Sequence, residues 1–218
     1  MATPEQSPQV GISNWQAGLK RSLDVALAIV GLIAVGWLIL LVWIAASLET
    51  RGNGLFVQDR VGRHGLVFPF IKIRTMPRGN HSSTSVTLRR DPRITRLGRL
   101  LRPCRIDELP PLFNVLWGHM SFVGPRPDVC GFADELKGED RIILSLRPGI
   151  TGPATLQFLN EEDLLAEQSD PERYNRAVIY PEKIRLNRAY IDNYGFRNDL
   201  GYIWKTLVGV ARSSLVRR

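Results

Sequence analysis

The chain has 218 residues, of which 44% are hydrophobic and 23% are charged, so it is neither a disordered tail nor a membrane protein with many spans. Its 29 lysines and arginines outnumber its 21 acidic residues, and the net charge of +8 indicates an anionic partner such as nucleic acid, acidic lipid or a phosphorylated substrate. Two cysteines, Cys104 and Cys130, cannot form a disulfide framework, and the sequence has no Cys/His cluster for zinc, so a reducing compartment is the simplest interpretation.

The N-terminal part of the chain divides into a leader and a membrane segment. Residues 1–19, with Pro4 and Pro8, are expected to form a flexible leader. Residues 25–47 contain no ionisable side chain, and as a helix they reach roughly 34 Å, which is enough for the hydrocarbon core of a bilayer. We therefore predict a membrane-inserted helix over residues 20–48.

The charges that flank this helix bear on its topology. Lys20 and Arg21 precede the apolar segment and Arg51 follows it, and basic residues favour the cytoplasmic side. This symmetry favours a re-entrant helix, which enters and leaves the membrane on one face. A single span with residues 1–19 outside is the alternative, and composition by itself leaves the two nearly even.

The next segment combines short strands with most of the positive charge. Residues 55–76 alternate between apolar and polar positions around glycine-rich turns, which predicts β-strands, with Lys72 and Arg74 on one strand face. Residues 60–105 contain twelve lysines and arginines and a single acid. Between Asp91-Pro92 and Pro103, arginines recur at every third position opposite leucines, so we predict a basic amphipathic helix that lies in the membrane interface. A solvated face or a lipid-binding patch is the alternative for these charges.

An acidic pair, Asp107 and Glu108, follows this basic helix and precedes Pro110-Pro111, where another helix is expected to begin. A carboxylate near a positive helix end and among arginines is favoured in its ionised form, which can bind Mg²⁺ or attack a phosphorus atom. The alternative is structural, with Asp107 as a helix cap and Glu108 as an ion-pair partner of Arg105.

The last third of the chain is expected to be mostly helical. Residues 160–173 are acidic and predict an exposed helix or loop, and Pro181 begins a further helix. Residues 200–210 form an amphipathic segment that either lies in the interface or packs on the core, and residues 211–218 form a basic tail. The expected fold is therefore α+β, with a cytosolic catalytic domain over residues 49–210, short strands and amphipathic interfacial helices.

Several ordered motifs occur together in this chain, namely KIRTM, RxxRIDELP, GPRPD and RPGITGPA. Together they resemble the bacterial sugar transferase family of monotopic phosphoglycosyl transferases, over residues 20–208. The resemblance implies an enzyme that transfers a sugar 1-phosphate from a nucleotide sugar, expected to be a UDP-sugar, to polyprenyl (undecaprenyl) phosphate. This reaction releases a nucleoside monophosphate and initiates a surface glycan. The resemblance also places the catalytic domain on the cytoplasmic face of the bacterial inner membrane.

The resemblance assigns roles to individual residues. Asp107 would attack the β-phosphate and form a phosphosugar ester, with Glu108 as its catalytic partner and Mg²⁺ at or next to Asp107. The residues expected to bind the phosphates are Arg102, Arg126, Arg147, Lys72 and Arg74. In GPRPD and RPGITGPA, Pro125 and Gly149 are interpreted as scaffold.

Three positions depart from the family pattern. Gly36-Trp37 stand where a Ser-Pro pair commonly breaks the membrane helix, and glycine only permits a kink. His119 replaces a common aspartate and Pro111 a common glutamine, and both are expected near the site.

Two other kinds of protein fit part of the pattern: a membrane-tethered, noncatalytic anion-binding protein and an inactive scaffold member of the family. Nucleic acid is not expected as a partner, because aromatic residues are not interleaved among the arginines. The expected partners are the nucleotide sugar, polyprenyl phosphate and membrane lipids. The identity of the sugar and self-association into a homo-oligomer are left open.

Overall fold

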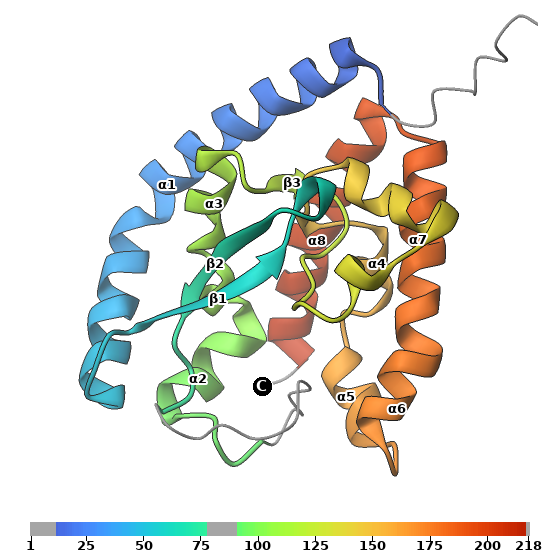
Figure 1. Cartoon of the computed structure of the whole chain (residues 1–218). Helices are drawn as coiled ribbons and strands as arrows, with labels where there is room; N and C mark the ends of the chain where they lie inside the picture. Colours follow the sequence, from blue (N-terminus) through green and yellow to red (C-terminus); the bar gives the residue numbers. More distant parts are fainter. Residues whose placement is uncertain (1–11, 78–90, 217–218) are drawn as a thin grey trace, which may run out of the picture.

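The computed structural model describes residues 12–77 and 91–216, with side chains as far as residue 209. It is a mixture of helices and short strands with one long N-terminal helix along its side, which confirms the mixed fold class (Figure 1). The α-helices are α1 (Asn14–Thr50), α2 (Arg96–Leu101), α3 (Pro111–Trp117), α4 (Pro153–Gln157), α5 (Glu161–Ala166), α6 (Pro171–Tyr174), α7 (Tyr180–Asp192) and α8 (Phe196–Val216). The strands are β1 (Leu55–Val61), β2 (Val67–Ile73), β3 (Ser121–Val123) and β4 (Gly149–Thr151). Three arginines of the basic stretch lie outside the described residues: Arg78, Arg89 and Arg90.

Helix α1 begins at a capping box, in which the Ser13 hydroxyl accepts a hydrogen bond from the Gln16 backbone and the Gln16 side chain accepts one from the Ser13 backbone. Residues 14–19, predicted to belong to the flexible leader, are helical, because this cap starts the helix at Asn14. The helix is continuous through Gly36-Trp37, and its 37 residues span roughly 55 Å. Among the described residues, α1 is the one helix that is long and apolar enough to cross a membrane, by length and composition.

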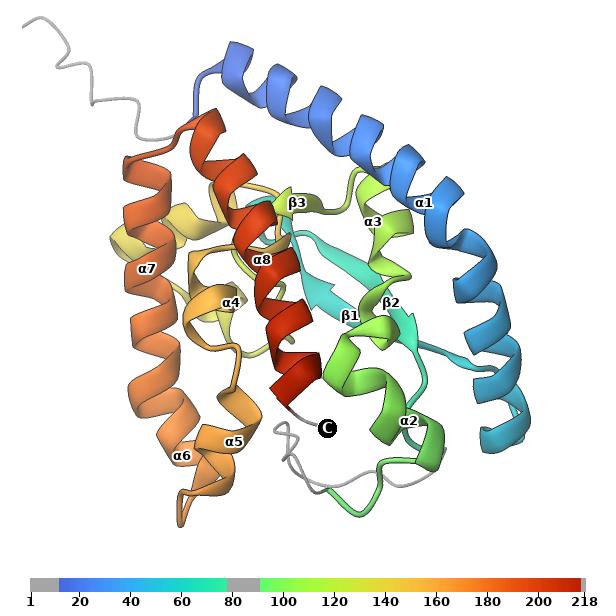
Figure 2. The same cartoon turned by 180° about the vertical axis from the view of Figure 1, so that it is seen from behind.

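One face of α1 lies along the rest of the protein and the other face is open. The inner face contacts α2, α3 and strands β1 to β3, and it buries Ala28, Val42 and Ala46 (Figures 1 and 2). Only 17% of its most apolar window is buried, so α1 is not the core helix of a soluble protein. The exposed large apolar residues of α1 are Trp15, Ile29, Val30, Ile33, Trp37, Leu40, Leu41, Trp43, Ile44 and Leu48.

Strands β1 and β2 form an antiparallel hairpin that runs from the pair Leu55–Ile73 to the pair Val61–Val67. This pairing confirms the strands that alternation predicted. The chain reverses in a 3₁₀ turn (Arg63–Gly65). Buried side chains of β2 pack against α1 and α3, so the hairpin joins the long helix to the core.

Strands β3 and β4 pair in parallel at a point where glycines bring two backbones together. A Cβ atom on Gly149 would lie 2.2 Å from the Gly124 nitrogen, and one on Gly124 would lie 2.5 Å from the Arg147 carbonyl oxygen. No side chain fits at such distances. The interpretation of Gly149 as scaffold is therefore confirmed.

The basic amphipathic helix is shorter than predicted. Thr95 caps α2 by accepting a hydrogen bond from the Gly98 backbone at 3.0 Å, whereas the Asp91 carboxylate accepts from the Arg93 backbone and so caps a separate turn. The helix therefore begins at Arg96, not at the Asp91-Pro92 pair. It still has two faces, with Leu101 buried and Leu100 exposed.

Helices α7 and α8 close the fold. Helix α7 begins one residue before the Pro181 start that the sequence predicts, and α8 lies on the side opposite the β1–β2 hairpin (Figures 1 and 2). The two alternatives for residues 200–210 both hold in part, because Tyr202 and Ile203 pack on the core while Trp204 and Leu207 are exposed. Helix α8 continues to Val216, into the predicted basic tail, whose side chains lie outside the described residues.

Candidate active site

A cavity of about 540 Å³ opens between β2, the two turns ahead of α3, and helices α4, α5 and α7. The charged residues of its wall are Lys72, Arg99, Arg102, Arg105, Asp107, Glu108, Arg126, Asp128, Glu161, Glu162, Asp163 and Lys183. Of the seven site residues that the sequence predicts, the cavity brings together five: Lys72, Arg102, Asp107, Glu108 and Arg126. A cavity of this size and charge can hold a small phosphorylated molecule.

The acidic pair lies in a 3₁₀ turn (Ile106–Glu108) directly ahead of α3. Helix α3 has no side-chain cap, so Asp107 is not the helix cap that the structural alternative required. Glu108 does form the ion pair with Arg105 that this alternative predicted, at 3.1 Å, and it also pairs with Arg126. The two neighbouring carboxylates therefore have different surroundings.

Their pKa values differ for the same reason. Burial raises the pKa of Asp107 to about 6, the negative charge of Glu108 adds to the effect, and Lys72 and Arg102 oppose it. Burial acts on Glu108 in the same direction, but Arg126 and Arg105 outweigh it and hold the pKa of Glu108 well below its usual range. Glu108 is thus a fixed anion, whereas Asp107 is a buried carboxyl that can titrate near neutral pH.

Two cations of the cavity wall flank Asp107 from different elements. Lys72 projects from β2 with its ammonium 5.2 Å from the centre of the Phe56 ring, and burial lowers its pKa. Arg102 lies in the turn ahead of the acidic pair, pairs with Glu162 of α5, and lies 3.5 Å from the Thr75 hydroxyl. These contacts hold both cations near the carboxyl without neutralising it directly.

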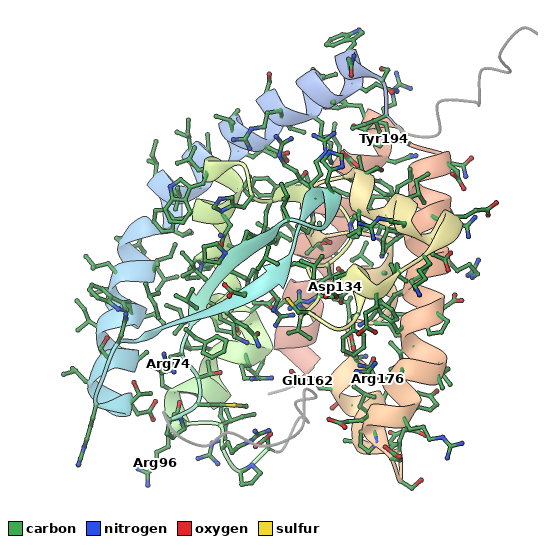
Figure 3. All side chains as sticks on the ribbon, viewed as in Figure 1. Arg74, Arg96, Asp134, Glu162, Arg176 and Tyr194 are labelled. Atoms are coloured by element: carbon green, nitrogen blue, oxygen red, sulfur yellow. The ribbon has the colours of Figure 1, made fainter. Side chains whose placement is uncertain are left out.

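Arg74 and Arg147 are not part of the cavity wall. Arg74 donates hydrogen bonds to the carbonyl oxygens of Asn53 and Leu55, at 2.9 and 3.0 Å, and lies well away from Glu162 (Figure 3). Arg147 donates to the Gly118 carbonyl at 2.8 Å. Both guanidinium groups therefore hold backbone oxygens at the ends of local elements, and the structure does not bring them to the phosphate-binding position predicted for them.

Comparison with known proteins identifies the family of this chain. The family model described as bacterial sugar transferase matches residues 15–213. The chain belongs to the bacterial sugar transferase family. It is 43% identical over 193 residues to the undecaprenyl-phosphate glucose phosphotransferase of Komagataeibacter xylinus, covering 83% of this chain and 35% of that protein.

Two further relatives show how much of each protein the match covers. Identity is 35% to the UDP-glucose:undecaprenyl-phosphate glucose-1-phosphate transferase of Caulobacter vibrioides, covering 86% of this chain and 68% of the relative. It is 30% to the undecaprenyl-phosphate galactose phosphotransferase of Salmonella typhimurium, covering 89% and 40%. The chain thus spans less than half of some of these relatives.

In this member of the sugar transferase family, the cavity includes residues that the sequence patterns did not indicate. Asp128 is the last residue of the GPRPD motif, and burial raises its pKa to about 6 against the nearby charges of Lys183 and Arg60. Tyr180, Lys183 and Asn187 lie on α7 at helical spacing, so a search for one polar helix face would have found them. Lys183 is paired with Glu161 at 2.8 Å.

The two departures expected near the site lie elsewhere. Pro111 is buried in the first turn of α3, and His119 follows that helix with its ring 5.6 Å from the ring of Phe68. Neither residue lines the cavity.

Whether a divalent cation fits the cavity depends on the side chains that could bind it. Among the described residues no group of three His, Cys, Asp or Glu side chains could hold a metal by itself. Mg²⁺ commonly binds one or two carboxylates together with water and substrate phosphate. Asp107 is 6% exposed and lines the cavity, and the neighbouring carboxylate of Glu108 is held by arginines, so the residues fit a cation that arrives with a phosphorylated substrate.

Proposed function

We propose that this transferase moves a sugar 1-phosphate from a UDP-sugar to undecaprenyl phosphate through an ester on Asp107. The observation that carries the proposal is the contrast within the acidic pair: Asp107 is buried at the cavity with a raised pKa, while Glu108 is held as an anion by two arginines. The names of the relatives support the donor and acceptor classes, since these proteins are named for transfer to undecaprenyl phosphate and one is named for UDP-glucose.

The proposed reaction has two displacements at one phosphorus atom. A carboxylate oxygen of Asp107 attacks the β-phosphorus, the bond to the bridging oxygen breaks, and UMP leaves with the electron pair. A phosphate oxygen of the polyprenyl acceptor then attacks the same phosphorus, and the bond to Asp107 breaks. Lys72, Arg102 and Arg126 neutralise the phosphoryl oxygens, which is the main demand of phosphoryl transfer.

Glu108 acts as a positioning residue in this scheme. Its carboxylate binds Arg126 and Arg105 at once and so holds two guanidinium groups at the cavity wall. Mg²⁺ bound at Asp107 and the diphosphate would neutralise phosphate charge and align the donor. Two relatives are named exopolysaccharide production proteins, which supports a role in initiating a surface glycan.

The contacts of α1 support a helix whose two ends stay on one face of the membrane. Near its N-terminus, Lys20 lies 2.6 Å from Asp199 of α8, and near its C-terminus, Glu49 accepts a hydrogen bond from the Leu97 backbone of α2. A helix that crossed the membrane would separate these contacts by roughly 30 Å of hydrocarbon. We place the apolar outer face of α1 against lipid and the catalytic domain on the cytoplasmic side.

The test is release of UMP from UDP-sugars by the full chain in detergent with undecaprenyl phosphate and Mg²⁺. Asp107→Asn should lower turnover at least about a thousandfold, because the nucleophile is lost. The control is Asp59→Asn, since Asp59 is exposed on β1 and lies outside the cavity. Trapping of a sugar-phosphate ester on Asp107 would support the covalent step. Turnover that survives Asp107→Asn would overturn the role of Asp107 as the nucleophile. UMP release that is absent with every donor would leave a noncatalytic anion-binding protein instead.

A further inference from the structure

Three buried polar side chains in the cavity wall have oxygen atoms without a hydrogen-bond partner. They are the Thr155 hydroxyl of α4, the Tyr180 hydroxyl and the Asn187 amide oxygen of α7. Thr155 is 9% exposed and Asn187 is 5% exposed. A buried oxygen that lacks a donor costs about 1 to 3 kcal/mol, so such atoms usually have a partner that is not part of the chain.

The three side chains form one neutral group. Helix α4 packs against α7, and Thr155, Tyr180 and Asn187 line the same cavity as the acidic pair. The phosphate-binding cations come from other elements, namely β2, the turn ahead of the acidic pair and the GPRPD segment. The wall thus adds neutral hydrogen-bonding side chains to its charged ones, and Lys183, which lies between Tyr180 and Asn187 on α7, is paired with Glu161. This combination matches a donor with a charged diphosphate and a neutral end.

We propose that Thr155, Tyr180 and Asn187 form the subsite that binds the hydroxyl groups of the transferred sugar and selects among sugars. This inference rests on the proposed function, because it names the group that the transferase recognises. The Thr155 and Tyr180 hydroxyls can donate as well as accept, and the Asn187 amide oxygen accepts, so the cluster suits a ligand whose groups do both. Each hydroxyl of a hexopyranose both donates and accepts, whereas a uracil ring offers one N–H donor and two carbonyl acceptors. The sugar can therefore pair with the three groups in more arrangements than the base.

The subsite also explains why these three polar side chains have buried oxygen atoms. A site that hydrogen-bonds a substrate hydroxyl rejects an analogue in which that hydroxyl is absent or misplaced, because its own polar atoms are then left unpaired. Replacement of the oxygens by apolar groups of similar shape should therefore reduce selectivity without reducing stability.

The variants for the test are Thr155→Val, Tyr180→Phe and Asn187→Leu, each of which removes the polar atom and nearly keeps the volume. The control is Ser145→Ala, since the Ser145 hydroxyl is also buried without a partner but lies outside the cavity wall. UMP release is measured with the UDP derivatives of glucose, galactose, N-acetylglucosamine and N-acetylgalactosamine.

For each cavity variant, we expect the preference in kcat/KM for the best donor over its epimer to fall about fivefold or more, with inhibition by UMP unchanged. Ser145→Ala should keep the preference of the native protein. An equal loss for all four donors, or weaker inhibition by UMP at constant preference, would overturn the assignment, the latter because the cluster would then contact the nucleoside.

Thermal unfolding of the unliganded protein separates this role from a structural one. Thr155→Val and Tyr180→Phe should unfold at the same or a higher temperature than the native chain, because an unpaired buried oxygen is removed. A lower unfolding temperature for both variants would show that these oxygens stabilise the fold, which contradicts the proposal.

A binding measurement keeps the subsite distinct from the transfer reaction. In the Asp107→Asn background, calorimetry compares the affinity for each UDP-sugar with the affinity for UDP. The subsite variants should abolish the affinity that the sugar adds, even if the native chain releases no UMP and the transfer proposal fails. If the sugar adds the same affinity in all variants, the subsite is wrong whatever the turnover.

Discussion

At the scale of single residues, the site depends on two adjacent carboxyl groups that are kept in different states. Asp107 is buried and flanked by cations that do not bind it directly, whereas Glu108 is bound by Arg126 and Arg105. Neighbouring positions in one turn thus supply a titratable carboxyl, which is the proposed nucleophile, and a permanent anchor for two arginines of the cavity wall.

The raised pKa of Asp107 predicts an acid limb in the activity profile. The nucleophile must be deprotonated, so kcat/KM should rise with pH through about 6 and be lost below it. Because Lys72 lowers the pKa of Asp107, Lys72→Met should move the limb to higher pH as well as weaken turnover. UMP release is measured between about pH 4.5 and 9, a range that brackets the expected pKa of Asp107.

The pKa of Asp128 is similar, so the contribution of Asp128 to the pH profile must be separated from that of Asp107. In Asp128→Asn the limb should persist, because it belongs to Asp107. Loss of the limb in this variant would assign the titration to Asp128 instead.

At the scale of elements, the long helix is held to the domain by buried polar contacts as well as by apolar packing. The Lys20 ammonium lies 2.6 Å from a carboxylate oxygen of Asp199, which also accepts a hydrogen bond from the Tyr190 hydroxyl. Both charged groups are almost fully buried. This network fixes the start of α1 against α7 and α8.

Removal of one partner of this pair should therefore be costly. Lys20→Met leaves the Asp199 carboxylate buried without its cation and should destabilise the fold by about 3 kcal/mol, measured by denaturant unfolding in detergent. Lys205→Met, at an exposed position of α8, should change stability little. A much smaller loss in the double variant with Asp199→Leu would confirm that the unpaired charge is the cause.

The close contact of β3 and β4 gives a second prediction at this scale. Gly149→Ala places a Cβ atom 2.2 Å from the Gly124 nitrogen, so the strands must separate and little folded protein should be recovered. Gly201→Ala is the matched control, because a Cβ atom there meets no other atom within 4 Å. Similar yields of the two variants would contradict this reading of the strand pair.

At the scale of the whole molecule, one helix, α1, carries the exposed apolar surface and packs beside the domain that contains the cavity. The inner face of α1 contacts the domain along most of its length, and its outer face exposes large apolar residues such as Ile33 and Leu48, at 77% and 75%. Exposed apolar surface of this extent marks a partner or a membrane. Because this apolar surface lies on a helix that packs beside the domain, it favours contact with one face of a membrane over a span.

This arrangement predicts the result of site-specific labelling. With Cys104 and Cys130 replaced by serine, single cysteines at Trp15 and at Asp59 should both react with an impermeant maleimide only after the cells are opened. Both native side chains are exposed, one at the start of α1 and one in the domain beyond it. Labelling of the Trp15 position in intact cells would instead establish a single span.

The sequence by itself determined the membrane segment, the β1–β2 hairpin and the acidic pair, because each depends on a local pattern of hydropathy, alternation or charge within a few dozen residues. Its motifs also indicated Arg102 and Arg126, which the structure places in the cavity wall with Asp107. These are properties that neighbouring residues specify without reference to the rest of the fold.

Only the tertiary structure decided which distant side chains share the cavity. Lys72 and Arg74 lie two residues apart, yet only Lys72 lines the cavity, since the strand ends between them and Arg74 turns to backbone carbonyls. Arg147 likewise donates a hydrogen bond to the Gly118 carbonyl. Thr155 and Asn187 come to the cavity through the packing of α4 on α7. Such assignments depend on contacts between segments far apart in the sequence, which no local pattern encodes.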